Sequence, residues 1–154
     1  MNSEPLITLL TTVAAGVLTA IASVFLALRK FRTERWWERK AQAYSDLFVA
    51  LFNVQRSLRV QIDREETGAQ YNEDFLGELR LVASAGHVEV RKAAAIGTFI
   101  FNRATSTRLE KLVSQLDDSQ HDVNFYEELC DNLDAVTSAL EDLKKLSKTD
   151  LSVR

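Results

Sequence analysis

Residues 37–62 read WERKAQAYSDLFVALFNVQRSLRVQI. Apolar side chains recur there in steps of four and three residues, with Gln55 in one slot: Trp37, Ala41, Tyr44, Phe48, Leu51, Leu58 and Ile62. This spacing places them on one face of a helix. The chain has a single proline and five glycines, and neither type occurs between Val17 and Thr67. Since helix breakers are this scarce, the sequence predicts an all-α fold built on one long helix.

A basic segment precedes this stripe. Residues 29–40, which we call the collar, contain six basic side chains and only two acidic ones. Anionic lipid head groups attract such a segment, and tryptophan favours the membrane interface. The predicted membrane-interface residues are Arg29, Lys30, Arg32, Arg35, Trp36 and Trp37. Alternatively, at least one of the two tryptophans is the first residue of the apolar core of the following domain rather than a membrane anchor.

Residues 6–28 carry no charged side chain. A helix of this length reaches about 34 Å, enough to cross a hydrocarbon core of about 30 Å. Core helices seldom run this long without a charge. A signal peptide would begin with basic residues, whereas the residues before this stretch include Glu4 and no Lys or Arg, and the basic residues follow the stretch. The collar therefore predicts a single-pass protein of the bacterial inner membrane, with its N-terminus outside and its C-terminal domain in the cytoplasm.

The predicted span is rich in small residues. Thr12, Gly16 and Ala20 are spaced by four, which allows helix backbones to approach closely in lipid. These three residues are the predicted oligomerisation face, although such composition is also common in membrane helices. The expected organisation is a tail and transmembrane helix over 1–28, the collar over 29–40, and a helical bundle over 41–154. The span could continue into the bundle unbroken or kink within the collar.

Downstream, polar loops and helix caps divide the chain. We expect a loop over 63–71, then a helix capped by Asn72 that breaks at Gly86 or ends at Gly97, and a buried connector over 96–101. Asn102 is expected to cap a helix over 103–116, and a turn over 117–120 leads to a last helix. Four segments with short connections predict an antiparallel cytoplasmic bundle, in which the first and last helices pack together.

The stretch Trp37-Glu38-Arg39-Lys40-Ala41-Gln42-Ala43-Tyr44 resembles the W-E-x-K-x-x-A-Y motif of many uncharacterised small bacterial proteins with one membrane span. In those proteins the motif also follows the span, and no reaction is assigned to them. The layout is also similar to the membrane accessory protein of type VI CRISPR systems. That likeness implies ring-like assembly into a pore during phage defence.

Few residues suggest chemistry. Arg80 and His87 resemble the R-x(4–6)-H pattern of HEPN nucleases, but Leu81 stands where those domains prefer a polar residue. An ordinary surface or capping role for the pair is the expected one. Two histidines and the single Cys130 predict no metal site, and no cofactor motif is present. From Ala41 onward there are 19 acidic and 13 basic residues, which argues against general nucleic-acid binding.

The expected function is that of an oligomeric membrane effector or pore, in phage defence by the resemblance, rather than that of an enzyme. Its expected partners are the lipid bilayer, further copies of the chain and a protein from a neighbouring gene. A membrane-tethered adaptor or sensor that binds a protein or small ligand is the alternative. A HEPN-like nuclease is the second alternative and depends wholly on Arg80 and His87.

Overall fold

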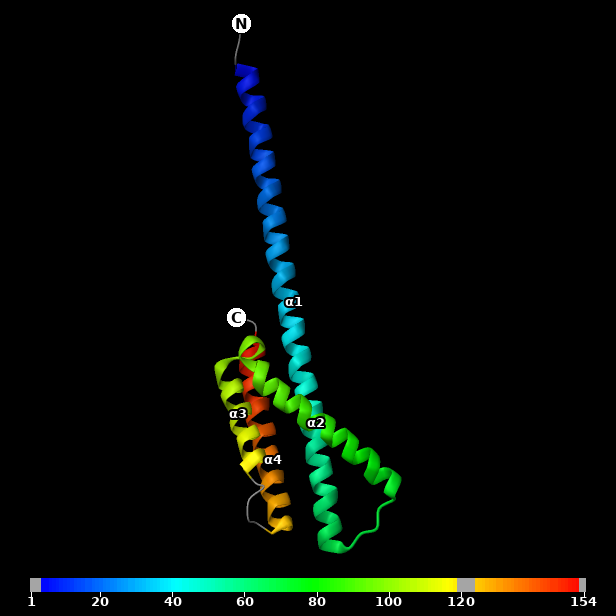
Figure 1. Cartoon of the computed structure of the whole chain (residues 1–154). Helices are drawn as coiled ribbons and strands as arrows, with labels where there is room; N and C mark the ends of the chain where they lie inside the picture. Colours follow the sequence, from blue (N-terminus) through cyan, green and yellow to red (C-terminus); the bar gives the residue numbers. More distant parts are fainter. Residues whose placement is uncertain (1–3, 119–123, 153–154) are drawn as a thin grey trace. The chain divides into compact units, whose positions relative to one another are not determined.

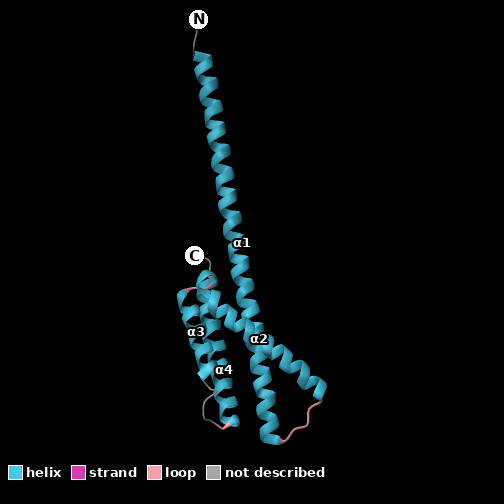
Figure 2. Ribbon diagram, viewed as in Figure 1, coloured by secondary structure: helices cyan, strands magenta, loops and turns pink. Residues whose placement is uncertain are grey.

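The structure is a computed structural model, which describes residues 4–118 and 124–152, with side chains from residue 23 onward (Figure 1). It contains four helices: α1 (Glu4–Thr67), α2 (Glu73–Ile100), α3 (Arg103–Asp118) and α4 (Phe125–Leu151). Over the described residues the chain forms helices and loops and no strands (Figure 2). The predicted all-α class is confirmed.

The chain divides into two compact units, Met1–Arg39 and Lys40–Arg154. In the first unit α1 carries an ion pair between Lys30 and Glu34 at 3.8 Å, and the Arg35 guanidinium lies 4.4 Å from the centroid of the Phe31 ring. Among the described residues, no helix is both long enough and apolar enough to span a membrane. Most of the predicted span falls on residues 6–22, whose side chains lie outside the described part.

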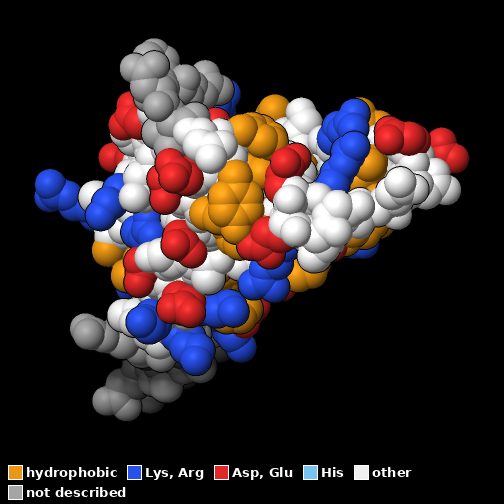
Figure 3. All heavy atoms as spheres, turned by 90° about the horizontal axis from the view of Figure 1, so that it is seen from below, with side chains coloured by type: hydrophobic (Ala, Val, Ile, Leu, Met, Phe, Trp, Pro, Cys, Tyr) orange, Lys and Arg blue, Asp and Glu red, His pale blue; other side chains and the backbone are white. Residues whose placement is uncertain are grey.

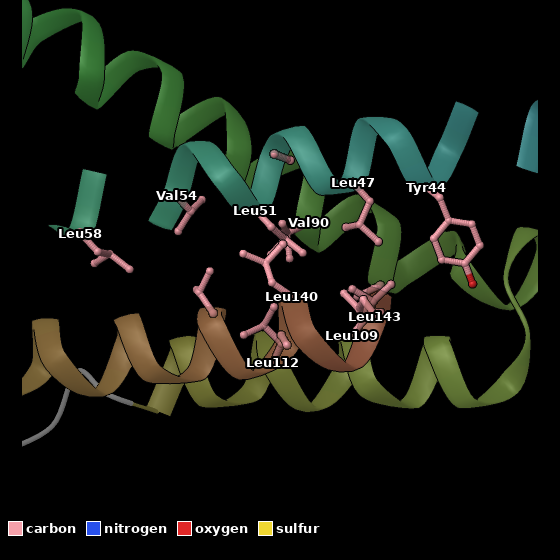
Figure 4. Close-up of a cluster of buried hydrophobic side chains, with 14 of the residues drawn as sticks. Tyr44, Leu47, Leu51, Val54, Leu58, Val90, Leu109, Leu112, Leu140 and Leu143 are labelled. Atoms are coloured by element: carbon pink, nitrogen blue, oxygen red, sulfur yellow. The ribbon is translucent and has the colours of Figure 1, made fainter. Parts of the chain in front are cut away.

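The second unit is a helical bundle with one apolar core (Figure 4). The α1 segment after Lys40 contributes Tyr44, Leu47, Leu51, Val54 and Leu58, so the stripe predicted from the sequence faces the core. Val90 of α2, Leu109 and Leu112 of α3, and Leu140 and Leu143 of α4 complete the labelled cluster. Trp36 and Trp37 are both exposed, so the core begins after them. As predicted, α1 contacts α4: Gln55 Nε2 donates to Thr137 Oγ1 at 2.8 Å, Tyr44 OH donates to Asp150 Oδ2 at 2.9 Å, and both helices contribute to the same apolar core.

The helix α2 crosses the bundle segment of α1 obliquely, whereas α3 and α4 run side by side in opposite directions (Figure 1). The predicted antiparallel arrangement therefore holds for α3 and α4 but not for α2. At the crossing, a Cβ atom on Gly86 would lie 2.7 Å from the Ala50 carbonyl oxygen. Gly86 is thus a point of backbone contact inside a continuous helix. Of the two alternatives for this position, a break or a helix that continues past it, the second is found.

The predicted end of the helix at Gly97 and the predicted connector over 96–101 are wrong. Gly97 lies inside α2, on the same buried side as Val90 and Ala94. A Cβ atom there would lie 3.3 Å from both the Phe101 ring and the Ser106 hydroxyl. The helix ends instead at Ile100, and the residue that caps it, Phe101, has an extended backbone and a buried ring.

The predicted caps are confirmed. The side chain of Asn72 accepts a hydrogen bond from Asp74 N at 2.9 Å at the start of α2. The side chain of Asn102 accepts one from Thr105 N at 2.8 Å at the start of α3. Each cap satisfies an amide that has no partner within its own helix. The predicted turn over 117–120 is wrong for Asp117 and Asp118, which belong to α3, and residues 119 and 120 lie outside the described residues.

Candidate functional site

An enclosed polar cluster of the bundle surrounds Asp150, in the last turns of α4. Lys40 Nζ donates to Asp150 Oδ1 at 2.6 Å, and Tyr44 OH donates to Asp150 Oδ2 at 2.9 Å. The backbone amide of Asn102 donates to Oδ2 at 3.2 Å. The Asp150 side chain is 8% exposed and that of Lys40 is 16% exposed. Three donors from three separate parts of the chain therefore converge on one buried carboxylate.

The cluster extends to the start of α3. Tyr44 OH lies 2.9 Å from Thr105 Oγ1, which is fully buried. Burial by itself would raise the pKa of Asp150, but hydrogen bonds from Lys40, Tyr44 and Asn102 outweigh it and hold that pKa below its ordinary value. Burial raises the pKa of Tyr44, and Asp150 raises it further. Tyr44 therefore stays a neutral donor and Asp150 an ionised acceptor at neutral pH.

These hydrogen bonds link the helices α1, α3 and α4 to one another and leave no reactive group of the cluster exposed to a substrate. The carboxylate of Asp150 is occupied by its donors, and its charge is balanced by Lys40 at hydrogen-bond distance. Lys40 and Tyr44 are the K and the Y of the W-E-x-K-x-x-A-Y motif, and one helical turn separates them. We call Lys40, Tyr44, Thr105 and Asp150 the clamp, because they tie the first bundle turns of α1 to the start of α3 and the end of α4.

Sequence reasoning missed the clamp. Lys40 was assigned to the collar and Tyr44 to the apolar stripe, while Asp150 stands 110 residues after Lys40. The apolar stripe already placed Tyr44 in the core, and a buried tyrosine hydroxyl usually finds a polar partner. That hydroxyl was the one signal in the sequence, but nothing in the sequence identifies Asp150 as the partner.

Arg80 and His87 have different surroundings although both lie on α2. Arg80 is exposed and lines a small cavity with Leu76, Leu79 and Phe125. His87 is half-buried, and burial lowers the pKa of its imidazole; Arg91 lowers it further, while Asp117 acts in the opposite direction. Arg91 itself is paired with Asp117. Seven positions on one helix separate the Cα atoms of Arg80 and His87 by about 10 Å. The continuous helix keeps the two residues two turns apart, and the nuclease hypothesis stays a prediction.

A polar groove of about 740 Å³ runs between α3 and α4. Arg108 lies in its wall: Nε donates to Asp142 Oδ2 at 2.8 Å and Nη2 donates to Ser138 Oγ at 3.2 Å. Its Nη1 is buried and has no hydrogen-bond partner among the described residues. Lys111, Asp131 and other side chains of both signs line the rest. The groove thus offers charged donors and acceptors to a polar ligand. Sequence reasoning did not single it out.

The remaining predicted site residues all lie on α1. The side chains of Thr12, Gly16 and Ala20 lie outside the described residues. Arg29, Lys30, Arg32, Arg35, Trp36 and Trp37 are all exposed. In the part of the chain that the structure describes, no three His, Cys, Asp or Glu side chains gather closely enough to hold a metal ion.

Charges and apolar groups share the surface of the bundle. On the face of the molecule seen in Figure 3, Lys and Arg side chains are mixed with Asp and Glu, and apolar side chains show between them. The exposed large apolar side chains of the bundle gather mainly on α1 and α2: Val49, Phe52, Leu81, Val82, Val88, Ile96 and Phe99. Comparison of the chain with models of protein families, with curated proteins and with solved structures found no match.

Proposed function

We propose that this chain is a membrane-anchored helical protein that acts as an oligomeric membrane effector or pore. The observation that carries the proposal is the uncharged stretch 6–28 followed directly by the six basic residues of the collar. Such a stretch is long enough to cross a bilayer, and basic residues after it favour a single-pass protein of the bacterial inner membrane with the bundle on the cytoplasmic side.

The bundle supports the proposal in two ways. One helix, α1, carries both the predicted span and the first stripe of the bundle core, and the clamp fixes its first bundle turns to α3 and α4. In addition, several large apolar side chains of α1 and α2 are exposed. Large exposed apolar surface in a folded protein commonly marks a site of association. An assembly of several copies is therefore the proposed active form.

Expression of the full chain in bacteria with a voltage-sensitive dye tests the proposal. We expect depolarisation of the membrane, with loss of the effect in Gly16→Ile, because a branched side chain would hold the packed spans apart. Arg80→Ala and His87→Ala should depolarise as the natural sequence does, since neither residue belongs to the proposed assembly. An unchanged membrane potential, even with neighbouring genes present and under phage challenge, would contradict the effector and its place in phage defence.

A membrane-tethered adaptor or sensor is the second candidate, and the groove between α3 and α4 favours it. The unsatisfied Nη1 of Arg108 would donate a hydrogen bond to an acceptor atom of a polar ligand after a small rearrangement of the side chain. In this case, Arg108→Ala would abolish a response that Gly16→Ile leaves intact. The HEPN-like nuclease ranks last, and ribonuclease activity that depends on both Arg80 and His87 would restore it.

A further inference from the structure

The helix α2 has two apolar sides. One side is buried in the bundle and carries Leu79, Ala83, Gly86, Val90 and Ala94. The opposite side carries six residues spaced by four and three positions, which we call the outer stripe: Leu81, Ala85, Val88, Lys92, Ala95 and Phe99. All six are exposed, Leu81 by 74% and Phe99 by 79%. A surface helix normally turns a charged side to water, so an outer stripe with one charge in six positions calls for a partner.

The outer stripe borders a concave surface. Where α2 crosses α1, Val49, Ala50 and Asn53 of α1 and Val82 of α2 line an open cleft of about 440 Å³. Ala85 belongs to the outer stripe and also lines this cleft. The same helix therefore offers a protruding aromatic side chain, Phe99, near its C-terminal end and borders a hollow near its middle that could receive one.

We propose that the outer stripe of α2 is the surface on which a second copy of this chain docks, with the two α2 helices antiparallel. This inference rests on the proposed oligomeric function and names the surface that joins the copies. In the antiparallel register Leu81 lies opposite Phe99 of the second copy, and Ala85 lies opposite Ala95 of the second copy. The small alanines let the helix axes approach closely, while each Phe99 reaches Val82 and the mouth of the cleft on the other copy.

Charge and symmetry favour this orientation. In a parallel pair Lys92 would face Lys92 of the second copy across the stripe. In the antiparallel pair Lys92 lies opposite Val88 and beside Glu89 of the second copy, so opposite charges meet on the flank. Glu89 Oε1 already lies 3.3 Å from Lys92 Nζ of the same chain, and both side chains are exposed and within reach of a second copy. A two-fold axis makes every such contact twice, which is the usual form of a self-complementary interface.

Disulfide cross-linking of the full chain in mild detergent tests the register. In a Cys130→Ser background, the double variant Ala85→Cys/Ala95→Cys should oxidise to a covalent dimer, twice the chain mass of 17.4 kDa. Neither single variant should do so, because equivalent positions lie about 15 Å apart in an antiparallel pair. The two cysteines of one chain are separated by the same distance along α2 and cannot bridge each other. Dimers of the single variants would indicate a parallel pair and overturn the proposal.

A matched pair of substitutions tests the surface itself. Phe99→Glu in the double-cysteine variant should reduce the covalent dimer about tenfold or more, since a carboxylate would be buried without a partner. Phe125→Glu changes another exposed phenylalanine, which lies on α4 outside the outer stripe, and should leave the dimer unchanged. Equal dimer yields from the two variants, with helicity preserved, would overturn the proposed surface.

The outcome separates this inference from the function on which it rests. If the double-cysteine variant gives no dimer while Gly16→Ile still reduces the mass of the natural assembly, the copies associate through the spans and only the α2 surface fails. A strictly monomeric mass of the natural chain would overturn both the proposed assembly and the proposed surface.

Discussion

Replacing Gly86 by alanine tests the proposed role of the α1–α2 crossing. A Cβ atom at this position would lie 2.7 Å from the Ala50 carbonyl oxygen and 3.1 Å from Val54 Cγ2. The nearer atom belongs to the backbone of a packed helix and cannot rotate away, so α2 must move outward. Overpacking of this kind typically costs about 1–3 kcal/mol. Alanine gains about 0.5–1 kcal/mol over glycine inside a helix, so we expect Gly86→Ala to lower the free energy of unfolding by up to about 2.5 kcal/mol.

Gly77 provides the matched control within the same helix. A Cβ atom on Gly77 would have no neighbour within 4 Å, so Gly77→Ala receives only the helix-propensity gain of about 0.5–1 kcal/mol. Urea unfolding of the full chain in mild detergent, followed by far-ultraviolet circular dichroism, measures both variants. In thermal unfolding of the same variants, the midpoint temperature should shift by about 4 °C for each kcal/mol of change in the free energy of unfolding. If Gly86→Ala proves as stable as Gly77→Ala, the close approach of α2 to Ala50 does not constrain the fold and the reasoning is refuted.

Three further predictions concern the clamp and the topology. Asp150→Asn should lower the free energy of unfolding at pH 7. Because the folded-state pKa of Asp150 is below its ordinary value, the stabilisation it provides is present above the unfolded pKa and is lost as the pH falls through the folded pKa. A pH series of unfolding midpoints should therefore be flatter below about pH 4 for the variant than for the natural chain, and equal slopes would contradict the ion pair. Tyr44→Phe should cost about 1–2 kcal/mol in urea unfolding, since it removes the hydroxyl shared by Asp150 and Thr105; an unchanged midpoint would show that the hydroxyl contributes nothing. For topology, a membrane-impermeant thiol reagent applied to intact cells should label Ser3→Cys and leave Cys130 unlabelled, and the reverse pattern would overturn the proposed orientation.

The sequence determined the helical class and most of the local structure. The three- and four-residue spacing of apolar side chains across residues 37–62 is a property of neighbouring positions, and it placed Tyr44, Leu51 and Leu58 in the core correctly. Asn72 and Asn102 were recognised as caps for the same reason, because a cap and the amide that it accepts from lie two or three residues apart. Where the physical cause is local, the sequence is sufficient.

Tertiary structure decided the roles of the glycines and of the clamp. A glycine within a helical pattern is compatible with a break or with close packing, and only the position of Ala50 shows that Gly86 serves the packing. The pairing of Lys40 with Asp150 depends on how α1 and α4 meet, which no spacing within either segment encodes. The outer stripe of α2 could not be predicted for the same reason. Its apolar residues are visible in the sequence, but which side of α2 is buried in the bundle follows only from the crossing of α2 over α1.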